Sequence, residues 1–372
     1  MTHRVAVNLT WCVPGAVGGS EEYLCRQLLG FPEHDSEQTV DITVFAPRGF
    51  GDAHPEIASR FAVVEMDHDG RSRPRRVYSE STWLHRRTET FDLVHHGGGT
   101  MPLRRRRPTV LTIHDLQYLS FPGYFRAHKL AYLKTVMPRS ARRADVITVP
   151  TGFVSRTVSD AYGIDESRIV VVPHGIESTI GTHATDAQLL RDRYGLGDSP
   201  IVVFPAMTHP HKGHSFLLDV FAGEWSRTDP DLRLVLIGGA GLAEDAVVEQ
   251  ITRLGIADRV VKPGRVSDAD RDGLVAMADA LVFPSQYEGF GAPVIEAMAL
   301  GAPVISSDQA CLPEVVGDAG LVLPLDRAAW AGALDVIRRE RGRLVSAGRE
   351  RVTRFSAEVS GAALRDAYRR LW

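Results

Sequence analysis

The chain has 372 residues, more than a single hydrophobic core usually supports, so two domains are expected. Hydrophobic residues make up 44% and charged residues 24%, and a net charge of −3 excludes a strongly basic or acidic protein. Three scattered cysteines exclude a disulfide framework, and no apolar run approaches the roughly 20 residues that span a bilayer. The first residues, MTHRVAVNLTWCVPGA, lack the apolar centre of a signal peptide and predict a first strand, so a cytoplasmic location is expected.

Short β-rich runs alternate with helical patterns in the first half of the chain. Helices are predicted near 21–29 and 129–143. Runs of Val and Ile without alternation fit parallel strands buried on both faces, and this rhythm is typical of a doubly wound sheet. The predicted strands are RVAVNL (4–9), VDITVFA (40–46), FDLVHHG (91–97), PTVLTIHD (108–115), DVITVP (145–150) and RIVVVP (168–173).

The segment 174–199 interrupts this rhythm, and we interpret it as the crossing into a second domain. The rhythm then resumes with PIVVFP (200–205), LRLVLIGG (232–239), DRVVKPG (258–264), DALVFPS (279–285), APVISS (302–307) and GLVLP (320–324). The predicted fold class is therefore α/β, with two Rossmann-like, doubly wound parallel-sheet domains facing across a cleft. We expect a first domain over 1–173 and a second over 174–355, with a helix over 356–372 packing back on the first.

Arginines are concentrated between Arg71 and Arg107, where ten of them face three acidic residues, a local net charge of +7. A solvated loop would account for such a run. The alternative is a patch for an anionic acceptor or for an anionic membrane surface, which attracts each basic residue with roughly 1 kcal/mol. No aromatic interleaving or nucleic-acid motif accompanies these arginines, so nucleic acid is not an expected partner.

The stretch EGFGAPVIE, Glu288 to Glu296, follows the predicted strand LVFP. Pro293 suits the first turn of a helix, whose free N–H groups and partial positive charge favour an anion such as phosphate. The two glycines between the acids let the backbone approach a ligand closely. Glu296 can accept hydrogen bonds from a diol such as a ribose, and Glu288 can hold a second polyol. Alternatively, the two acids are an exposed loop residue and a first-turn residue that complements the helix dipole.

The form EGFGAPVIEAMALGAPVI resembles the E-x7-E signature of the family-four, group 1 retaining glycosyltransferases, which have the GT-B fold. Other segments resemble the same family: GAVGGSEEYL (15–24), TIHDLQYLSFPGYF (112–125), VVPHGI (171–176) and FPAMTHPHKGH (204–214). Gly213 departs from the pattern, since Asn is usual there. The arginine that most members carry before the lysine is also absent, so either Lys212 acts with helix dipoles alone or His209 or His211 adds a pH-dependent cation.

The resemblance implies a donor that is a GDP- or UDP-linked nucleotide-diphosphate sugar, and an acceptor with a free hydroxyl group. It implies that Glu296 meets the ribose, Glu288 the sugar hydroxyls and Lys212 the diphosphate, while His114 lies beside the donor sugar. The base is expected against the backbone of 264–266. The predicted catalytic residues are Glu288, Lys212 and His114, and the predicted donor-binding residues are Gly18, Gly19, Arg265, Val266, Gly289, Phe290, Gly291, Ala292 and Glu296.

By resemblance, the expected reaction is retaining transfer of mannose or another hexose in the assembly of bacterial surface polysaccharide or glycolipid. A lipid-linked acceptor, and peripheral contact with the inner face of an anionic membrane through Arg71–Arg107, are open alternatives. No cofactor or metal is expected: the histidines near Lys212 lack cysteines or carboxylates at ligand spacing, and Asp67-His-Asp69 lies in a charged loop rather than after a strand. A nucleotide-sugar epimerase of the same fold, or an inactive nucleotide-sugar-binding subunit, is the alternative function.

Overall fold

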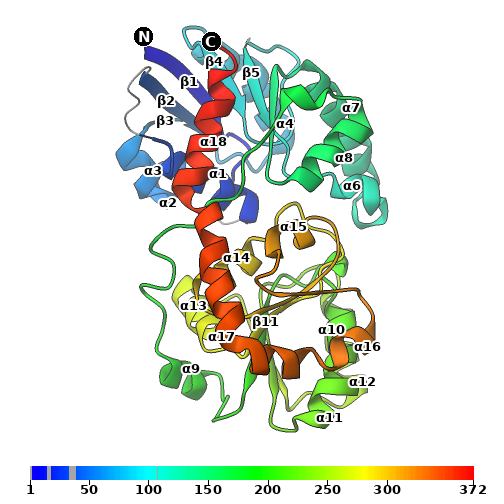
Figure 1. Ribbon diagram of the computed structural model, residues 1–372. Helices are drawn as coiled ribbons and strands as arrows, with labels where there is room; N and C mark the ends of the chain where they lie inside the picture. Colours follow the sequence, from blue (N-terminus) through cyan, green and yellow to red (C-terminus); the bar gives the residue numbers. More distant parts are fainter. Residues whose placement is uncertain (1, 15–17, 33–38, 107) are drawn as a thin grey trace. The chain divides into compact units, whose positions relative to one another are not determined.

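The computed structural model describes residues 2–14, 18–32, 39–106 and 108–372, and it divides into two compact units. Unit 1 comprises Met1–Gly175 and Phe355–Trp372, and unit 2 comprises Ile176–Arg354. Each unit contains one parallel sheet with helices on its faces (Figure 1). These two parallel-sheet α/β units confirm the predicted fold class.

The sheet of unit 1 has seven strands in the order β3-β2-β1-β4-β5-β6-β7, and all its neighbouring pairs are parallel. The chain therefore winds outward from β1 in one direction and from β4 in the other. The central strands β4, β5 and β6 are buried throughout, as strands covered on both faces must be. The strands are β1 (Thr2–Asn8), β2 (Thr39–Ala46), β3 (Ala62–Glu65), β4 (Leu93–His96), β5 (Thr109–Thr112), β6 (Val146–Val149) and β7 (Ile169–Val171).

The C-terminal helix α18 packs beside α1 in unit 1 (Figure 1). A Cβ at Gly361 would lie 2.1 Å from the backbone of Gly30, so glycine permits this close approach. Tyr368 also places its hydroxyl 2.8 Å from Nδ1 of His95 on β4. The helices of this unit are α1 (Gly19–Leu29), α2 (Phe50–Ala53), α3 (Pro55–Arg60), α4 (Arg73–Ser79), a π-helical turn (Glu80–Leu84), α5 (His85–Arg87), α6 (Gln117–Ser120), α7 (Ala127–Arg143), α8 (Gly152–Tyr162) and α18 (Ala357–Arg369), with 3-10 turns at Pro122–Tyr124 and Glu166–Arg168.

The sheet of unit 2 has six parallel strands in the order β10-β9-β8-β11-β12-β13. Its strands are β8 (Ile201–Pro205), β9 (Arg233–Ile237), β10 (Val260–Gly264), β11 (Ala280–Phe283), β12 (Val304–Ser307) and β13 (Leu321–Leu323). The chain leaves β8 toward β9 and β10, then returns to β11 on the other side of β8. The order of strands therefore reverses between β8 and β11.

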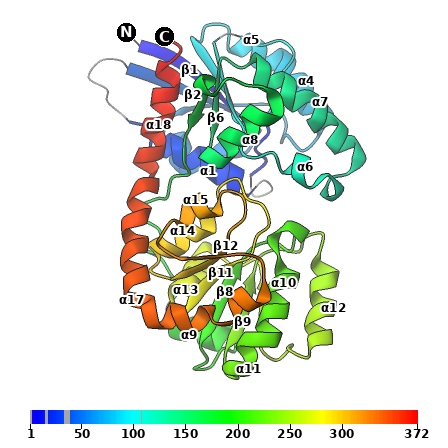
Figure 2. The ribbon, with the colours of Figure 1, turned by 45° about the vertical axis from the view of Figure 1, so that its right-hand side comes forward.

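The helices of unit 2 follow this winding. Figures 1 and 2 show α10 and α12 on one face of the sheet, and α13, α14 and α17 on the other. The helices are α9 (Ala187–Arg193), α10 (His214–Val220), α11 (Ser226–Thr228), α12 (Glu244–Leu254), α13 (Asp268–Ala276), α14 (Ala292–Ala299), α15 (Leu312–Val316), α16 (Arg327–Ala331) and α17 (Ala333–Val352), with a π-helical turn at Phe221–Trp225 and 3-10 turns at Pro210–Lys212 and Thr353–Phe355.

Every predicted strand is present, and one strand was missed. The missed strand is β3, which pairs with β2 at the edge of the unit 1 sheet. Its four residues, AVVE, are exposed or half-buried, so they form neither a long Val/Ile run nor a clear alternation. Within the ranges that the structure describes, no helix is both long and apolar enough to cross a membrane.

Candidate functional site

The candidate site of unit 2 lies where β8 and β11 end. In an open α/β sheet, ligands bind outside the carboxyl ends of the strands at the point where the strand order reverses. The loop after β8 carries Lys212 in a 3-10 turn, and the loop after β11 carries Glu288. The backbone N–H of Gln286 donates to the carbonyl of His211 at 2.7 Å, which ties the two loops together.

Lys212 and Glu288 form an ion pair at this point. Nζ of Lys212 lies 2.7 Å from Oε1 of Glu288, and the two side chains are 21% and 13% exposed. The ammonium group is also 5.8 Å from the centre of the Phe283 ring. An anion that reached Lys212 would therefore meet a partly desolvated cation, for which it would compete with a single carboxylate.

Two glycines in these loops have left-handed backbone conformations. Gly291 has φ +83° and precedes α14, where a Cβ would lie 2.8 Å from the Leu312 side chain. Gly213 has φ +78° and precedes α10, where a Cβ would lie 2.2 Å from the carbonyl oxygen of Pro284. Asparagine tolerates the left-handed region but carries a Cβ, so this close contact explains why Gly213 departs from the family pattern.

Glu296 lies in α14 and is 7% exposed. Arg271 of α13 is its nearby countercharge. Burial lowers the pKa of Arg271, but the carboxylates of Glu296, Asp272 and Asp268 outweigh burial and raise it. The guanidinium also bonds Asp272 at 2.9 Å and Asp268 at 2.9 Å. Our sequence analysis missed Arg271, because its partner Glu296 is distant in the chain.

A second cation, Lys262, lies in the same unit and was also missed. Lys262 on β10 forms an ion pair with Glu244, which also accepts a hydrogen bond of 2.7 Å from the Thr208 hydroxyl. The Thr208 hydroxyl in turn accepts from the backbone N–H of Gly241 at 2.7 Å. Thr208 follows β8, so this chain of contacts connects Lys262 to the loop that carries Lys212.

The imidazole of His214 lies near both lysines. Burial and the charges of Lys262 and Lys212 together lower the pKa of His214 to about 4. Burial, Lys212 and His209 together lower the pKa of His211 to about 3. His211 is therefore neutral near pH 7 and does not supply the missing arginine's charge.

The other predicted residues of unit 2 follow the strands β10 and β11 in the chain. Gly289, Phe290 and Ala292 belong to the loop and first turn between Glu288 and Glu296. Arg265 and Val266 follow β10, with Arg265 exposed and Val266 half-buried. Among the described residues, no group of three or more His, Cys, Asp or Glu side chains is arranged to hold a metal ion.

Gly18, Gly19 and His114 belong to unit 1. Gly18 has φ +77° and precedes α1, and the adjoining residues 15–17 lie outside the described residues. Nε2 of His114 donates to the carbonyl of Gly97 at 2.8 Å, and burial lowers the pKa of His114 to about 4. His114 is therefore a neutral imidazole whose Nδ1 has no hydrogen-bond partner within the described part of the chain.

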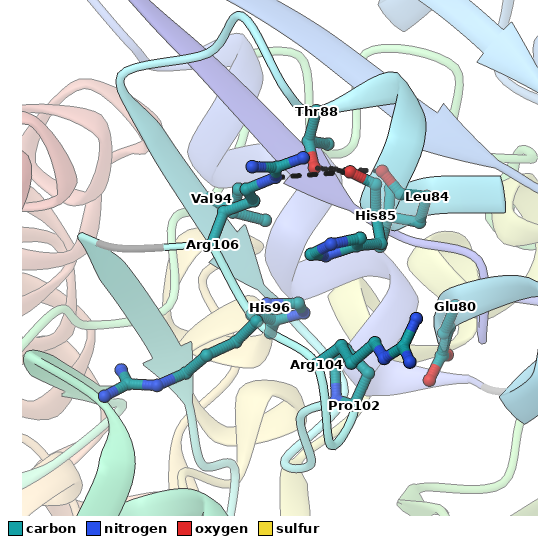
Figure 3. Close-up of a pocket in the computed structure, with 10 residues that line it drawn as sticks. Glu80, Leu84, His85, Thr88, Val94, His96, Pro102, Arg104 and Arg106 are labelled. Carbon is teal, nitrogen blue, oxygen red and sulfur yellow. Dashed lines mark hydrogen bonds between the residues drawn. The ribbon is translucent and has the colours of Figure 1, made fainter. Parts of the chain in front are cut away.

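Some arginines of the run in unit 1 form ion pairs with acidic residues. Arg75 pairs with Asp67 at 3.1 Å, Arg105 with Asp145 at 3.3 Å and Arg106 with Glu89 at 3.1 Å; Arg107 lies outside the described residues. Figure 3 shows Arg104 and Arg106 beside His85, His96 and Glu80 around a cavity of about 10 Å³, which is the room of one water molecule. Arg105 and Arg106 therefore already have acidic partners, and the cavity beside them is too small for a ligand larger than water.

Comparisons with known proteins identify the family. The model of "Glycosyltransferase Family 4" matches residues 17–180, and that of "Glycosyl transferases group 1" matches residues 186–346. The two models together cover most of both units. The chain belongs to the group 1, family 4 glycosyltransferases, which is the family that its motifs resemble.

Individual relatives share part of their length with this chain. An O-antigen chain mannosyltransferase B of Escherichia coli is 30% identical over 62% of this chain and 61% of its own length. A D-inositol 3-phosphate glycosyltransferase of Nocardia farcinica is 35% identical over 54% of this chain and 46% of its own length. The matches thus span about half to three fifths of these relatives. The crystal structure of Anabaena HepE in complex with UDP matches with a TM-score of 0.73 at 20% identity, over 99% of this chain and 100% of that one, and supports the GT-B fold.

Proposed function

We propose that this protein is a retaining glycosyltransferase that moves a hexose, mannose or another, from a nucleotide-diphosphate sugar to a hydroxyl group. The observation that carries the proposal is the Lys212–Glu288 pair, held at the strand-order reversal of unit 2 beside the start of α14. Family membership supports sugar transfer. The mannosyltransferase relative supports mannose and a role in bacterial surface polysaccharide or glycolipid assembly.

The proposed donor contacts follow from the charges of unit 2. The diphosphate would replace Glu288 as the ion-pair partner of Lys212 and would accept hydrogen bonds from N–H groups at the start of α14. Lys262 would be the second cation. Glu296 would bind the ribose, with the guanidinium of Arg271 as its nearby countercharge. Glu288, once released from Lys212, would accept from sugar hydroxyls, and the backbone of 264–266 would meet the base. Gly18, Gly19 and His114 stay predictions for unit 1.

The proposed reaction is a front-face substitution. The bond between the anomeric carbon and the leaving phosphate oxygen breaks, and the acceptor oxygen forms its bond to that carbon on the same face. The acceptor's proton passes to the departing phosphate. Lys212 and the N–H groups of α14 stabilise the negative charge that develops there, so neither glutamate needs to act as a nucleophile. Since lysines supply the positive charge, the proposal requires no metal ion.

The first experiment is a thermal-shift screen of the purified protein against UDP, GDP and their hexose conjugates. A ligand that prefers the folded state raises the unfolding temperature, so one nucleotide series should raise it. The donor found in this way is then incubated with a panel of acceptors, and the wild type is compared with Glu288→Gln. Transfer that Glu288→Gln performs as fast as the wild type would contradict the proposal.

Two alternatives give different results in the same assay. A nucleotide-sugar epimerase would convert the donor sugar with no acceptor present. An inactive binding subunit would bind the nucleotide and transfer sugar to no acceptor. We propose a cytoplasmic enzyme with a soluble or a lipid-linked acceptor. The exposed arginines of 71–106 would then contact an anionic membrane peripherally.

A further inference from the structure

Unit 1 has its own reversal of strand order, between β1 and β4, and a pocket lies there. The pocket has a volume of about 60 Å³. Asn8 ends β1, Trp11 follows it, and Gly98 follows β4, so the pocket is at the carboxyl ends of both strands. This is the position where an open α/β sheet binds ligands. The other walls come from α4 and α7, and we call this cavity the arginine pocket.

Helix α4 presents two arginines to this pocket. Arg73 and Arg76 lie one turn apart and line it together with Val77 and Glu80, the i, i+3, i+4 and i+7 positions of one helix face. Arg75 lies on another face, is exposed, and pairs with Asp67. The arginine run therefore contains an inward pair that is distinct from its solvated members.

The inward arginines keep much of their charge. The guanidinium of Arg73 lies 4.3 Å from the centre of the Tyr132 ring, a contact that orients a cation without neutralising it. Arg76 lies 3.9 Å from the carboxyl group of Glu80. Burial raises the pKa of Glu80, although Arg76 opposes this. Oε1 of Glu80 lies 3.0 Å from the Thr10 hydroxyl, which in turn donates to Oδ1 of Asn8 at 2.6 Å. The distance of 3.9 Å is longer than a hydrogen bond, so Glu80 does not satisfy the Nε donor of Arg76.

The pocket also borders buried donors that have no acceptor. Nε1 of Trp11 and Nε of Arg76 are buried without a hydrogen-bond partner among the described residues. A Cβ at Gly98 would lie 2.6 Å from the Trp11 ring, so this glycine lets the indole lie flat against the strand end. Buried donors without partners are costly, and a ligand rich in acceptor oxygens would satisfy them.

We propose that the arginine pocket binds a phosphate group of the acceptor, so that the enzyme glycosylates a phosphorylated polyol or sugar. This inference rests on the proposed function, which it deepens by naming the acceptor class. A cavity of about 60 Å³ holds roughly four to six water-sized groups, which fits a phosphate group better than a whole sugar ring. Two guanidinium groups match its oxygens, because arginine forms paired hydrogen bonds to phosphate.

The test is equilibrium binding to the full chain, measured by calorimetry. Inorganic phosphate and glycerol 3-phosphate are titrated into the Lys212→Met/Lys262→Met variant, in which the donor site has lost both of its proposed cations. Arg73→Gln and Arg76→Gln, each made in that background, should weaken binding about tenfold or more, whereas the matched control Arg75→Gln should leave it unchanged. Equal affinities across these variants would overturn the inference. Two separate inward variants guard against one that fails to fold, which circular dichroism would reveal.

A second arm separates the two sources of a phosphate group. Vesicles with phosphatidylglycerol are compared with neutral vesicles, again with the two inward variants. Binding of glycerol 3-phosphate that depends on Arg73 and Arg76 supports a soluble phosphorylated acceptor. Vesicle binding with the same dependence supports a lipid-linked one. Vesicle binding lost equally in Arg75→Gln is only surface attraction and counts against the pocket.

Binding of UDP and GDP to Arg73→Gln and Arg76→Gln distinguishes this inference from the proposed function. Both variants should bind the nucleotide as the wild type does, because neither arginine is among the proposed donor contacts. A wild-type protein that binds neither nucleotide would sink the proposed function and leave the phosphate result standing. Phosphate affinity that is indifferent to Arg73 and Arg76 would sink the inference and leave the function standing.

Discussion

Replacement of Lys262 tests whether this chain has exchanged the family's usual arginine for a lysine on another strand. In Lys262→Met, the diphosphate would lose a charge-assisted hydrogen bond worth about 1.5–3 kcal/mol, which corresponds to roughly 10- to 100-fold in affinity. The change would also leave Glu244 without its cation. The ammonium of Lys262 and the hydroxyl of Thr208 lower the pKa of Glu244, so this carboxylate is ionised and would repel the incoming anion.

The double variant Lys262→Met/Glu244→Gln separates these two effects. It removes the repulsion as well as the attraction, so we expect it to recover part of the affinity that the single variant loses. The assay is calorimetric titration of UDP and GDP, with Lys134→Met, an exposed lysine of unit 1, as the control. The side chains of Lys262 and Glu244 are 25% and 26% exposed, so the fold should tolerate both changes. Nucleotide affinity in Lys262→Met equal to that of the wild type would refute this reasoning.

Three further predictions follow from other parts of the structure. Gly213→Asn restores the family's usual residue, yet it should lower the free energy of unfolding by about 1–3 kcal/mol, because its Cβ would clash with the carbonyl group of Pro284. The control Gly195→Asn, where nothing lies within 4 Å of the added Cβ, should lower it less. Equal losses of the two variants in urea unfolding would contradict this. Burial lowers the pKa of His95 and of His96 to about 3, so below about pH 6.5 the unfolded chain binds more protons than the folded one. The free energy of unfolding should therefore fall as the pH decreases, by up to about 1.4 kcal/mol per pH unit for each histidine. If His95→Gln showed the same dependence of this free energy on pH as the wild type, the prediction would be wrong. Transferase activity should survive excess EDTA, and a strict Mn²⁺ requirement would count against lysine as the source of positive charge.

The strands could be predicted because parallel strands leave a local signal. Runs such as IVVF and ALVF are buried on both faces of the sheet, and four consecutive apolar residues are enough to indicate such a strand. The edge strand β3 has no such run, and its half-exposed residues resemble loop sequence. The start of α14 could likewise be predicted, because a glycine before a helix and a proline in its first turn follow from local backbone conformation, as Gly291 and Pro293 show.

Interactions between side chains that are distant in the sequence could not be predicted in the same way. Lys262 occurs in a strand, where a lysine is typical of an exposed edge; only the fold brings Glu244 to its side chain. Arg271 and Glu296 interact electrostatically because α13 and α14 cover the same face of the sheet. The sequence left open whether His209 or His211 replaces the absent arginine, and the burial of His211 now argues against His211.

The central claim is that Lys212 stabilises the leaving diphosphate, and the most direct measurement is single-turnover transfer by Lys212→Met with a donor that the wild type uses. Removing one such stabilising group typically costs about 10²–10³ in kcat. Because Lys212 is half-buried and its ion-pair partner within the described part of the chain is Glu288, the unfolding temperature should change little. The account predicts a folded variant that transfers sugar at least about 100-fold more slowly. A folded Lys212→Met variant that transfers at the wild-type rate would contradict it.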